Sequence, residues 1–249
     1  LLALMMVVGL LPMAALAADA PANNVAEVNG TKYTSVAKAI DATEAGQTVT
    51  LLTDVTEDVT IGSGKNIVLD LGGKTLTNAN AGKATLSVAG TATVKNGTIQ
   101  GGTSYYNIAV GTEAVPGGNL TLENITATAG NTGSSMIDNW GTLTIESGTY
   151  TGGLNVVKSE EGSKLTINGG TFTLDYAIKW KFNAAILVYG ETLITDGTFI
   201  NNAKVASAYP QVVMTGVVDG YTAITRITGG TFTNNFNGTN SGIFRALGK

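Results

Sequence analysis

A short pattern of apolar and polar residues recurs along most of the chain. In the copy LTINGGTF (165–172), an isoleucine is followed by three turn-forming residues, a threonine and a second apolar residue. The other copies occupy residues 69–76, 92–99, 120–127, 143–150, 192–199 and 225–232. Their threonines are separated by 23, 28, 23, 22, 27 and 33 residues. This spacing predicts a structural repeat of about 22 residues, lengthened in places by insertions.

The aligned copies place apolar side chains in two columns. The first column stands four residues before each threonine and contains Leu71, Val94, Leu122, Ile145, Ile167, Ile194 and Ile227. The second stands one residue after each threonine and contains Leu76, Ile99, Ala127, Tyr150, Phe172, Phe199 and Phe232. Because successive side chains of a strand point to opposite faces, we expect both columns to point inward and the Thr, Lys, Asn and Glu residues beside them to point outward.

The repeat predicts an all-β fold in which short strands stack as the coils of a β-solenoid. A unit of this size cannot bury its apolar side alone, so it must stack on its neighbours. Glycine-containing pairs such as N-G and G-G before most of the threonines favour the positive φ angles of a corner. A leucine-rich repeat would need an L-x-x-L-x-L pattern, which is missing, and a β-sandwich would not align one motif in fixed columns. Further β-prone runs, expected on the other sides of the coils, are 85–88, 107–110, 154–157, 185–189 and 211–214.

The segment before the first copy is organised differently. Thr34 or Ser35 is predicted to cap a short helix that ends at Gly46. One side of this helix is apolar and consists of Val36, Ala39 and Ile40. Such a helix would close the open apolar end of a stack. We therefore expect a linker and N-terminal cap over 18–62 and the solenoid over 63–249, with the solenoid truncated at its C-terminus.

The first 17 residues are predicted to be a secretory signal peptide. They are apolar and end in Ala15-Leu16-Ala17, which fits a cleavage site of the A-x-A type. The chain starts without a methionine or a basic stretch, so we expect the first residues of the signal peptide to be missing. A secreted or extracellular location follows, with no membrane span in the mature chain. Attachment to a cell wall would use a region outside this chain.

Composition narrows the chemistry further. The net charge is −4, and the chain has no histidine and no cysteine. With Arg226 and Arg245 as its only arginines, the sequence offers no basic patch for nucleic acid. It also lacks the residues for disulfides, thiolate or imidazole metal sites, and Ser-His or Cys-His nucleophiles. We expect no metal and no other cofactor; the sequence says nothing of the oligomeric state.

The segments NGTKYTSVAKAIDA, GQTVTLLTDVTEDVTI and NIVLDLGGKTLT, together with the LTINGGTF copies, resemble the pectin-lyase-like superfamily. Within it they resemble a secreted or surface branch of gut-type anaerobic bacteria that lacks catalytic motifs. The resemblance implies a right-handed, single-stranded parallel β-helix with a short N-terminal capping helix. It leaves function open, because the superfamily includes polysaccharide lyases, glycoside hydrolases, phage tailspikes and adhesins.

Catalytic signatures of the superfamily are not found. A lyase of this kind would need clustered acidic calcium ligands beside a basic residue, and a polygalacturonase would need paired Asp residues, His and R-x-K. If the chain is an enzyme, the candidate carboxyl groups are those of Glu123, Glu146 and Asp138. Two close acidic groups are expected to lie in solvated turns. They are Asp54, Glu57 and Asp58, and the pair Glu160 and Glu161.

Aromatic residues in the insertions at 100–119, 175–184 and 200–224 are the candidate ligand-binding residues. Sugar rings stack on exposed aromatic rings, and neighbouring lysines suit acidic sugars. An alternative is that these rings fold back over the edges of the coils. Trp140, just before a glycine corner, is expected to pack in the core or a corner. The candidates are Tyr105, Tyr106, Tyr176, Lys179, Trp180, Lys181 and Tyr209.

The sequence therefore favours a non-catalytic, adhesin-like display rod that binds polysaccharide or host-surface glycan weakly. A lyase or hydrolase of the same superfamily is the alternative. A further alternative is an ice-binding threonine array, because T-x-T pairs such as Thr171 and Thr173 recur on one face.

Overall fold

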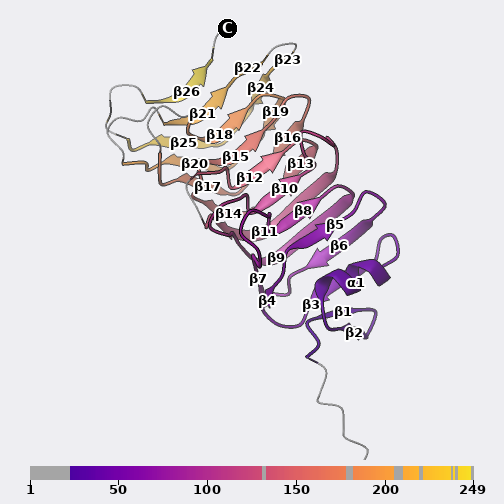
Figure 1. The fold of residues 1–249 in the computed structure, drawn as a ribbon. Coiled ribbons are helices and arrows are strands. Elements are labelled where there is room, and N and C mark those ends of the chain that lie inside the picture. Colours follow the sequence, from indigo (N-terminus) through magenta and orange to yellow (C-terminus); the bar gives the residue numbers. More distant parts are fainter. Residues whose placement is uncertain are drawn as a thin grey trace, which may run out of the picture.

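The computed structural model describes residues 23–130, 133–177, 182–204, 210–218, 221–236, 238 and 241–247. The predicted signal peptide (1–17) lies outside these residues. The described chain is nearly all β, with parallel strands stacked in two long sheets and one helix near the N-terminus (Figure 1). None of its helices has the length and apolar character needed to cross a membrane.

The first sheet has a main path and a branch. In order of pairing, the main path consists of β2 (Thr31–Tyr33), β1 (Ala26–Val28), β3 (Thr48–Leu51), β6 (Asn66–Asp70), β9 (Thr91–Gln100), β11 (Asn119–Thr128), β13 (Thr142–Ile145), β16 (Lys164–Ile167), β19 (Glu191–Ile194) and β24 (Ile224–Ile227). The branch consists of β4 (Val55–Thr56), β7 (Thr75–Thr77), β14 (Gly148–Thr151), β17 (Thr171–Leu174), β20 (Thr198–Asn201) and β25 (Thr231–Asn234). The long strands β9 and β11 join the path to the branch.

The second sheet is parallel throughout. Its strands are β5 (Val59–Ile61), β8 (Leu86–Val88), β10 (Ile108–Val110), β12 (Ile137–Asn139), β15 (Asn155–Ser159), β18 (Ala184–Val188), β21 (Gln211–Thr215) and β26 (Gly242–Ala246). The sequence pattern predicted five of these strands but missed β5, β12 and β26. Antiparallel pairing occurs between β1 and its neighbours β2 and β3, and between β22 (Val217–Val218) and β23 (Tyr221–Thr222).

Strand register confirms the two predicted columns with one exception. Val94, Leu122, Ile145, Ile167, Ile194 and Ile227 pair in sequence across the first sheet. The exception is Leu71, because Leu69 is the residue that pairs with Val94. A longer corner that includes Gly72 (φ +56°) and Gly73 (φ +75°) shifts the first copy by two residues. Leu71 is still fully buried, so the error concerns register and not burial.

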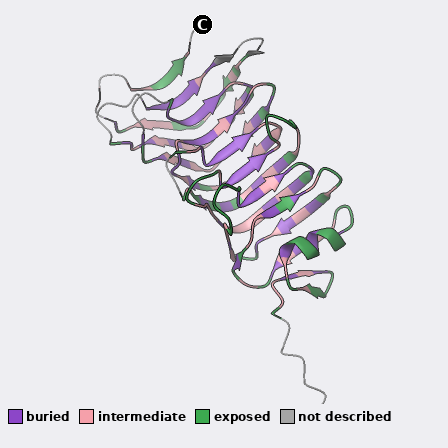
Figure 2. Cartoon of the chain, viewed as in Figure 1, coloured by how far each residue is buried: buried purple, intermediate pink, exposed green. Residues whose placement is uncertain are grey.

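The second column contains a stack of aromatic rings. Tyr150, Phe172, Phe199 and Phe232 pair in register on successive strands. Their ring centroids are 5.1, 5.0 and 4.8 Å apart and the rings are nearly parallel. The first three rings are fully buried, within the core that runs through the stack (Figure 2). Rungs about 4.8 Å apart make this stacking possible, because identical positions repeat at the separation of neighbouring strands.

The helix α1 (Val36–Ala42) lies at the N-terminal end of the stack (Figure 1). Ser35 is its N-cap, and its side-chain oxygen accepts a hydrogen bond of 3.2 Å from the Lys38 backbone N–H. The predicted apolar side is buried against the core. The helix ends at Ala42, four residues before the predicted end at Gly46, which has φ +80° in the following turn.

The carboxylates of Asp54, Glu57 and Asp58 accept hydrogen bonds from backbone N–H groups. The prediction that they lie in solvated turns is therefore incomplete. Glu57 accepts hydrogen bonds of 2.9 Å from two backbone N–H groups in the first turn of α1. Asp54 accepts from the Thr75 N–H, and Asp58 from the Ala79 N–H, each at 2.8 Å. These carboxylates therefore tie the cap to the first corners, as expected for acceptors beside unpaired N–H groups.

Candidate functional site

A column of outward-facing positions crosses the second sheet. On β10, β12 and β15, the residues Ala109, Asp138 and Lys158 pair in register. The residues on either side of them face the core, so these three point to the opposite face. Asp138 nevertheless has only 4% of its surface exposed. The outer face of this sheet is therefore covered at Asp138, where residues from the loops between strands lie over it.

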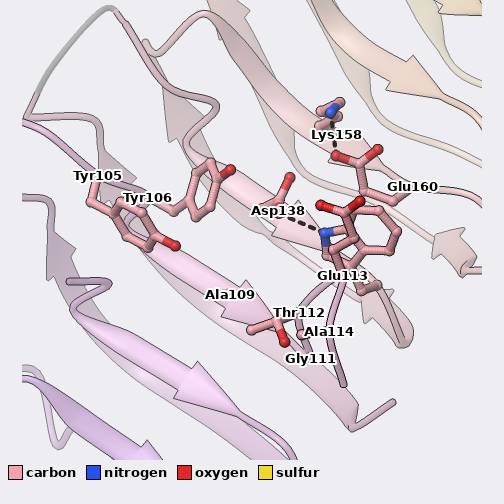
Figure 3. A pocket seen from close by; sticks show the side chains of 11 residues that line it. Tyr105, Tyr106, Ala109, Gly111, Thr112, Glu113, Ala114, Asp138, Lys158 and Glu160 are labelled. Carbon is pink, nitrogen blue, oxygen red and sulfur yellow. Dashed lines mark hydrogen bonds and ion pairs between the residues drawn. The ribbon is translucent and has the colours of Figure 1, made fainter. Parts of the chain in front are cut away.

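A hollow of about 410 Å³ lies over this column (Figure 3). The loop before β10 contributes Tyr105 and Tyr106, and the loop after it contributes Glu113. In Figure 3, Asp138 lies between Tyr106 and the acidic side chains of Glu113 and Glu160. The complete lining is Tyr105, Tyr106, Ala109, Gly111, Thr112, Glu113, Ala114, Asp138, Trp140, Lys158 and Glu160.

Asp138 is the most constrained acidic side chain in the hollow. The indole Nε1–H of Trp140 donates a hydrogen bond of 3.0 Å to its Oδ2. Its Oδ1 is buried and has no hydrogen-bond partner among the described residues. Burial raises the pKa of this carboxyl, although the charge of Lys158 and side-chain hydrogen bonding with Glu160 and Trp140 oppose the rise. An ionised Asp138 is thus only partly compensated by its surroundings.

Lys158 and Glu160 form an ion pair beside Asp138. Burial raises the pKa of Glu160 to about 7, against the opposing effect of Lys158 and with a further contribution from the charge of Asp138. Burial lowers the pKa of Lys158, but its bond and charge interaction with Glu160 outweigh this and leave the pKa raised. Glu160 is 4% exposed, so the prediction that it lies in a solvated turn is wrong.

Three aromatic residues border the same hollow. The rings of Tyr105 and Tyr106 are tilted against each other with centroids 4.5 Å apart, and Tyr105 is 37% exposed. Burial raises the pKa of the Tyr106 hydroxyl, so this group stays protonated in ordinary buffers. Trp140 lies in the corner between β12 and β13, one of the two predicted positions, and is half-buried and lines the hollow.

A second hollow, of about 260 Å³, adjoins the first. Tyr106 and Lys158 line both hollows. The Lys158 Nζ atom lies 5.6 Å from the ring centroid of Tyr189, which borders the second hollow. The second hollow is less acidic than the first, because no Asp or Glu is among its lining residues. They are Tyr106, Gly133, Ser134, Ser135, Leu154, Asn155, Lys158, Phe182, Leu187 and Tyr189.

The remaining sequence candidates are placed elsewhere. Tyr176 is 39% exposed and lines neither hollow. Glu123 lies on β11 and Glu146 follows β13, both in the first sheet, so the structure does not bring them together with Asp138. Glu146 instead accepts hydrogen bonds of 3.1 Å from the Asn168 side chain. Lys179, Trp180, Lys181 and Tyr209 lie outside the described residues.

Sequence reasoning missed Lys158, Glu160, Glu113 and the role of Trp140. Part of the signal was present: MIDNW (136–140) is a short run with one acidic side chain, and it lies between two copies of the motif as the predicted strands of the other coils do. Recognising this run as a strand would have placed Asp138 and Trp140 on the same outward face. It would not have shown that loops cover that face.

No protein-family model matches the chain, and no curated protein or solved structure matches it either. Within the described part of the chain, no group of three or more acidic residues is arranged to hold a metal ion.

Proposed function

We propose that this chain is a secreted or cell-surface β-helix protein that displays a glycan-binding site on the outer face of its second sheet. The two hollows over β10, β12, β15 and β18 would form this site. The proposal extends to the finer fold: a right-handed, single-stranded coil of about 22 residues, of the pectin-lyase-like kind. The repeat spacing, the parallel register of the first sheet from β3 onward and that of the whole second sheet support that assignment.

One observation carries the functional proposal: aromatic rings and buried hydrogen-bond acceptors border the same hollow. Tyr105, Tyr106 and Trp140 offer ring faces on which a sugar can stack, and Asp138 offers an acceptor for its polar groups. The volume of about 410 Å³ falls within the range of small-molecule sites. The parallel sheet beneath supplies a rigid support, which lowers the entropic cost of binding.

The test is a glycan array probed with the whole chain and with a Tyr105→Ala/Tyr106→Ala variant. We expect the double variant to bind roughly tenfold more weakly, because it loses the stacking surface. Tyr176→Ala is the matched control, since Tyr176 is as exposed as Tyr105 but lines neither hollow. Equal binding by the wild type and the double variant would remove the hollow from the proposal.

A glycoside hydrolase is the second candidate function, favoured by one specific observation. Two carboxyl groups, Asp138 and Glu160, line the same hollow, and the pKa of Glu160 is raised to about 7. A carboxyl that is protonated near neutral pH can act as a general acid beside an ionised one. Release of reducing ends from a polysaccharide panel, abolished by Glu160→Gln and retained in Tyr176→Ala, would support catalysis over binding alone.

A further inference from the structure

The charges around the first hollow are unbalanced. Among the described residues that line it, three carry carboxyl groups and one carries an ammonium group. The three acidic residues come from different parts of the fold. Glu113 lies in the loop after β10, Asp138 lies on β12, and Glu160 directly follows β15. A ligand that enters this hollow therefore meets an excess of negative charge.

The lysine of the hollow is already engaged. Lys158 forms an ion pair with Glu160 and lies against the ring of Tyr189. Asp138 keeps a buried Oδ1 atom without a hydrogen-bond partner among the described residues. An ionised carboxylate only accepts hydrogen bonds, so the missing partner must be a donor, and a positively charged donor gains most.

The aromatic border suits the same ligand chemistry. Tyr105, Tyr106 and Trp140 line the same hollow as the three carboxyl groups, and ring faces attract an ammonium group. A uronic acid would place its carboxylate against like charges in a partly buried site, which is unfavourable. An N-acetylated sugar would present a neutral amide to the carboxylates of the hollow, so it would lack the attraction between opposite charges.

We propose that the first hollow selects sugars that carry a free primary ammonium group, with Asp138 as its main partner and Glu113 as a second one. This inference rests on the proposed glycan-binding function and names its ligand class: a glucosamine-type sugar, in preference to its N-acetylated or acidic counterparts. Burial raises the pKa of both Asp138 and Glu160, which means that their ionised forms are poorly solvated, and a bound ammonium group would stabilise those forms.

The experiment uses tryptophan fluorescence. The chain has two tryptophans, so Trp180→Phe leaves Trp140, which borders the hollow, as the only one. In this background the protein is titrated with glucosamine tetramer, N-acetylglucosamine tetramer, galacturonic acid tetramer and propylammonium. We expect glucosamine tetramer to bind roughly tenfold more tightly than the N-acetylated tetramer, and the galacturonic acid tetramer to bind most weakly.

Two variants test the assigned partners. Asp138→Asn should remove most of the preference for glucosamine tetramer. Glu113→Gln should reduce it roughly threefold, and because Glu113 is exposed on a loop, this variant stays informative even if Asp138→Asn does not fold. Asp41→Asn, an exposed carboxylate on α1, is the matched control and should leave the preference unchanged.

The outcomes separate the two proposals. Binding of the N-acetylated or acidic tetramer as tightly as glucosamine tetramer would overturn the ammonium selectivity and leave glycan binding standing. Binding of propylammonium without any of the sugars, lost in Glu113→Gln or Asp138→Asn, would support the ammonium site and overturn glycan binding. Failure of all four ligands to bind would overturn both.

Discussion

Trp140 donates a hydrogen bond of 3.0 Å from its indole nitrogen to Oδ2 of Asp138. The two residues are two positions apart, so they project to the same outward face of the sheet. The bond joins a carboxylate that is almost fully buried to a ring that is only half-buried. Trp140 therefore both shields Asp138 from water and supplies one of its hydrogen bonds.

Trp140→Phe should destabilise the protein by about 1 to 3 kcal/mol, because it leaves a buried acceptor without its donor. The measurement is urea unfolding at pH 8, where Asp138 is ionised in the unfolded chain. The double variant Trp140→Phe/Asp138→Asn should lose less stability than the sum of the single changes. Strict additivity would show that the bond contributes nothing in solution.

Stability should fall as the pH rises from about 4.5 to about 7. The pKa of Glu160 is raised from 4.5 to about 7 in the folded protein, so the folded state binds its proton more tightly than the unfolded state in this window. The loss should be on the order of 2 kcal/mol and complete above pH 7. The raised pKa of Asp138 acts in the same direction, whereas Lys158 and Tyr106 titrate at higher pH.

Glu160→Gln provides the check on that dependence. Unfolding free energies measured by denaturant titration between pH 4 and 8 should decrease with pH in the wild type. The decrease should be clearly smaller in Glu160→Gln, because the amide does not ionise. Parallel pH profiles for the two proteins would assign the dependence to other groups.

Phe172→Ala should cost about 3 to 5 kcal/mol, because Phe172 is fully buried between Tyr150 and Phe199 in the ring stack. Phe172→Asp should cost more, since it places a charge in the core. The matched control is Thr173→Ala, the neighbouring residue on the opposite face of the same strand, which should change stability little. The measurement is the melting temperature of the three variants. If Phe172→Asp melts at the same temperature as the wild type, the assignment of Phe172 to the core is wrong.

Gly148→Ala should be strongly destabilising for two reasons. Its φ is +129°, a conformation that favours glycine, and an added Cβ would lie 2.2 Å from the Ile125 carbonyl oxygen on the neighbouring rung. Gly64→Ala is the control, because its φ is ordinary and no atom lies within 4 Å of the added Cβ. Similar melting temperatures for the two variants would show that the corner can rearrange.

The regular part of the fold could be predicted because it depends on local rules. Alternation of side chains and the turn preference of glycine are properties of short segments. The columns through Ile167 and Phe172 and the corner at Gly148 could therefore be predicted from the sequence. The same locality explains the helix, since Ser35 and the spacing of Val36, Ala39 and Ile40 act within two turns. Leu71 was misplaced because aligning the copies on their threonines assumed corners of constant length.

Only the tertiary structure decided the candidate site. Glu113, Asp138 and Glu160 are far apart in the sequence, and they meet because successive rungs bring β10, β12 and β15 side by side under the loop that carries Tyr105 and Tyr106. The raised pKa of Glu160 depends on burial by residues from other rungs, which no local pattern encodes. The sequence by itself determined which side chains face inward and where the chain turns. The stacking of rungs decided which outward side chains share one hollow, because contacts between distant residues depend on register and loop placement.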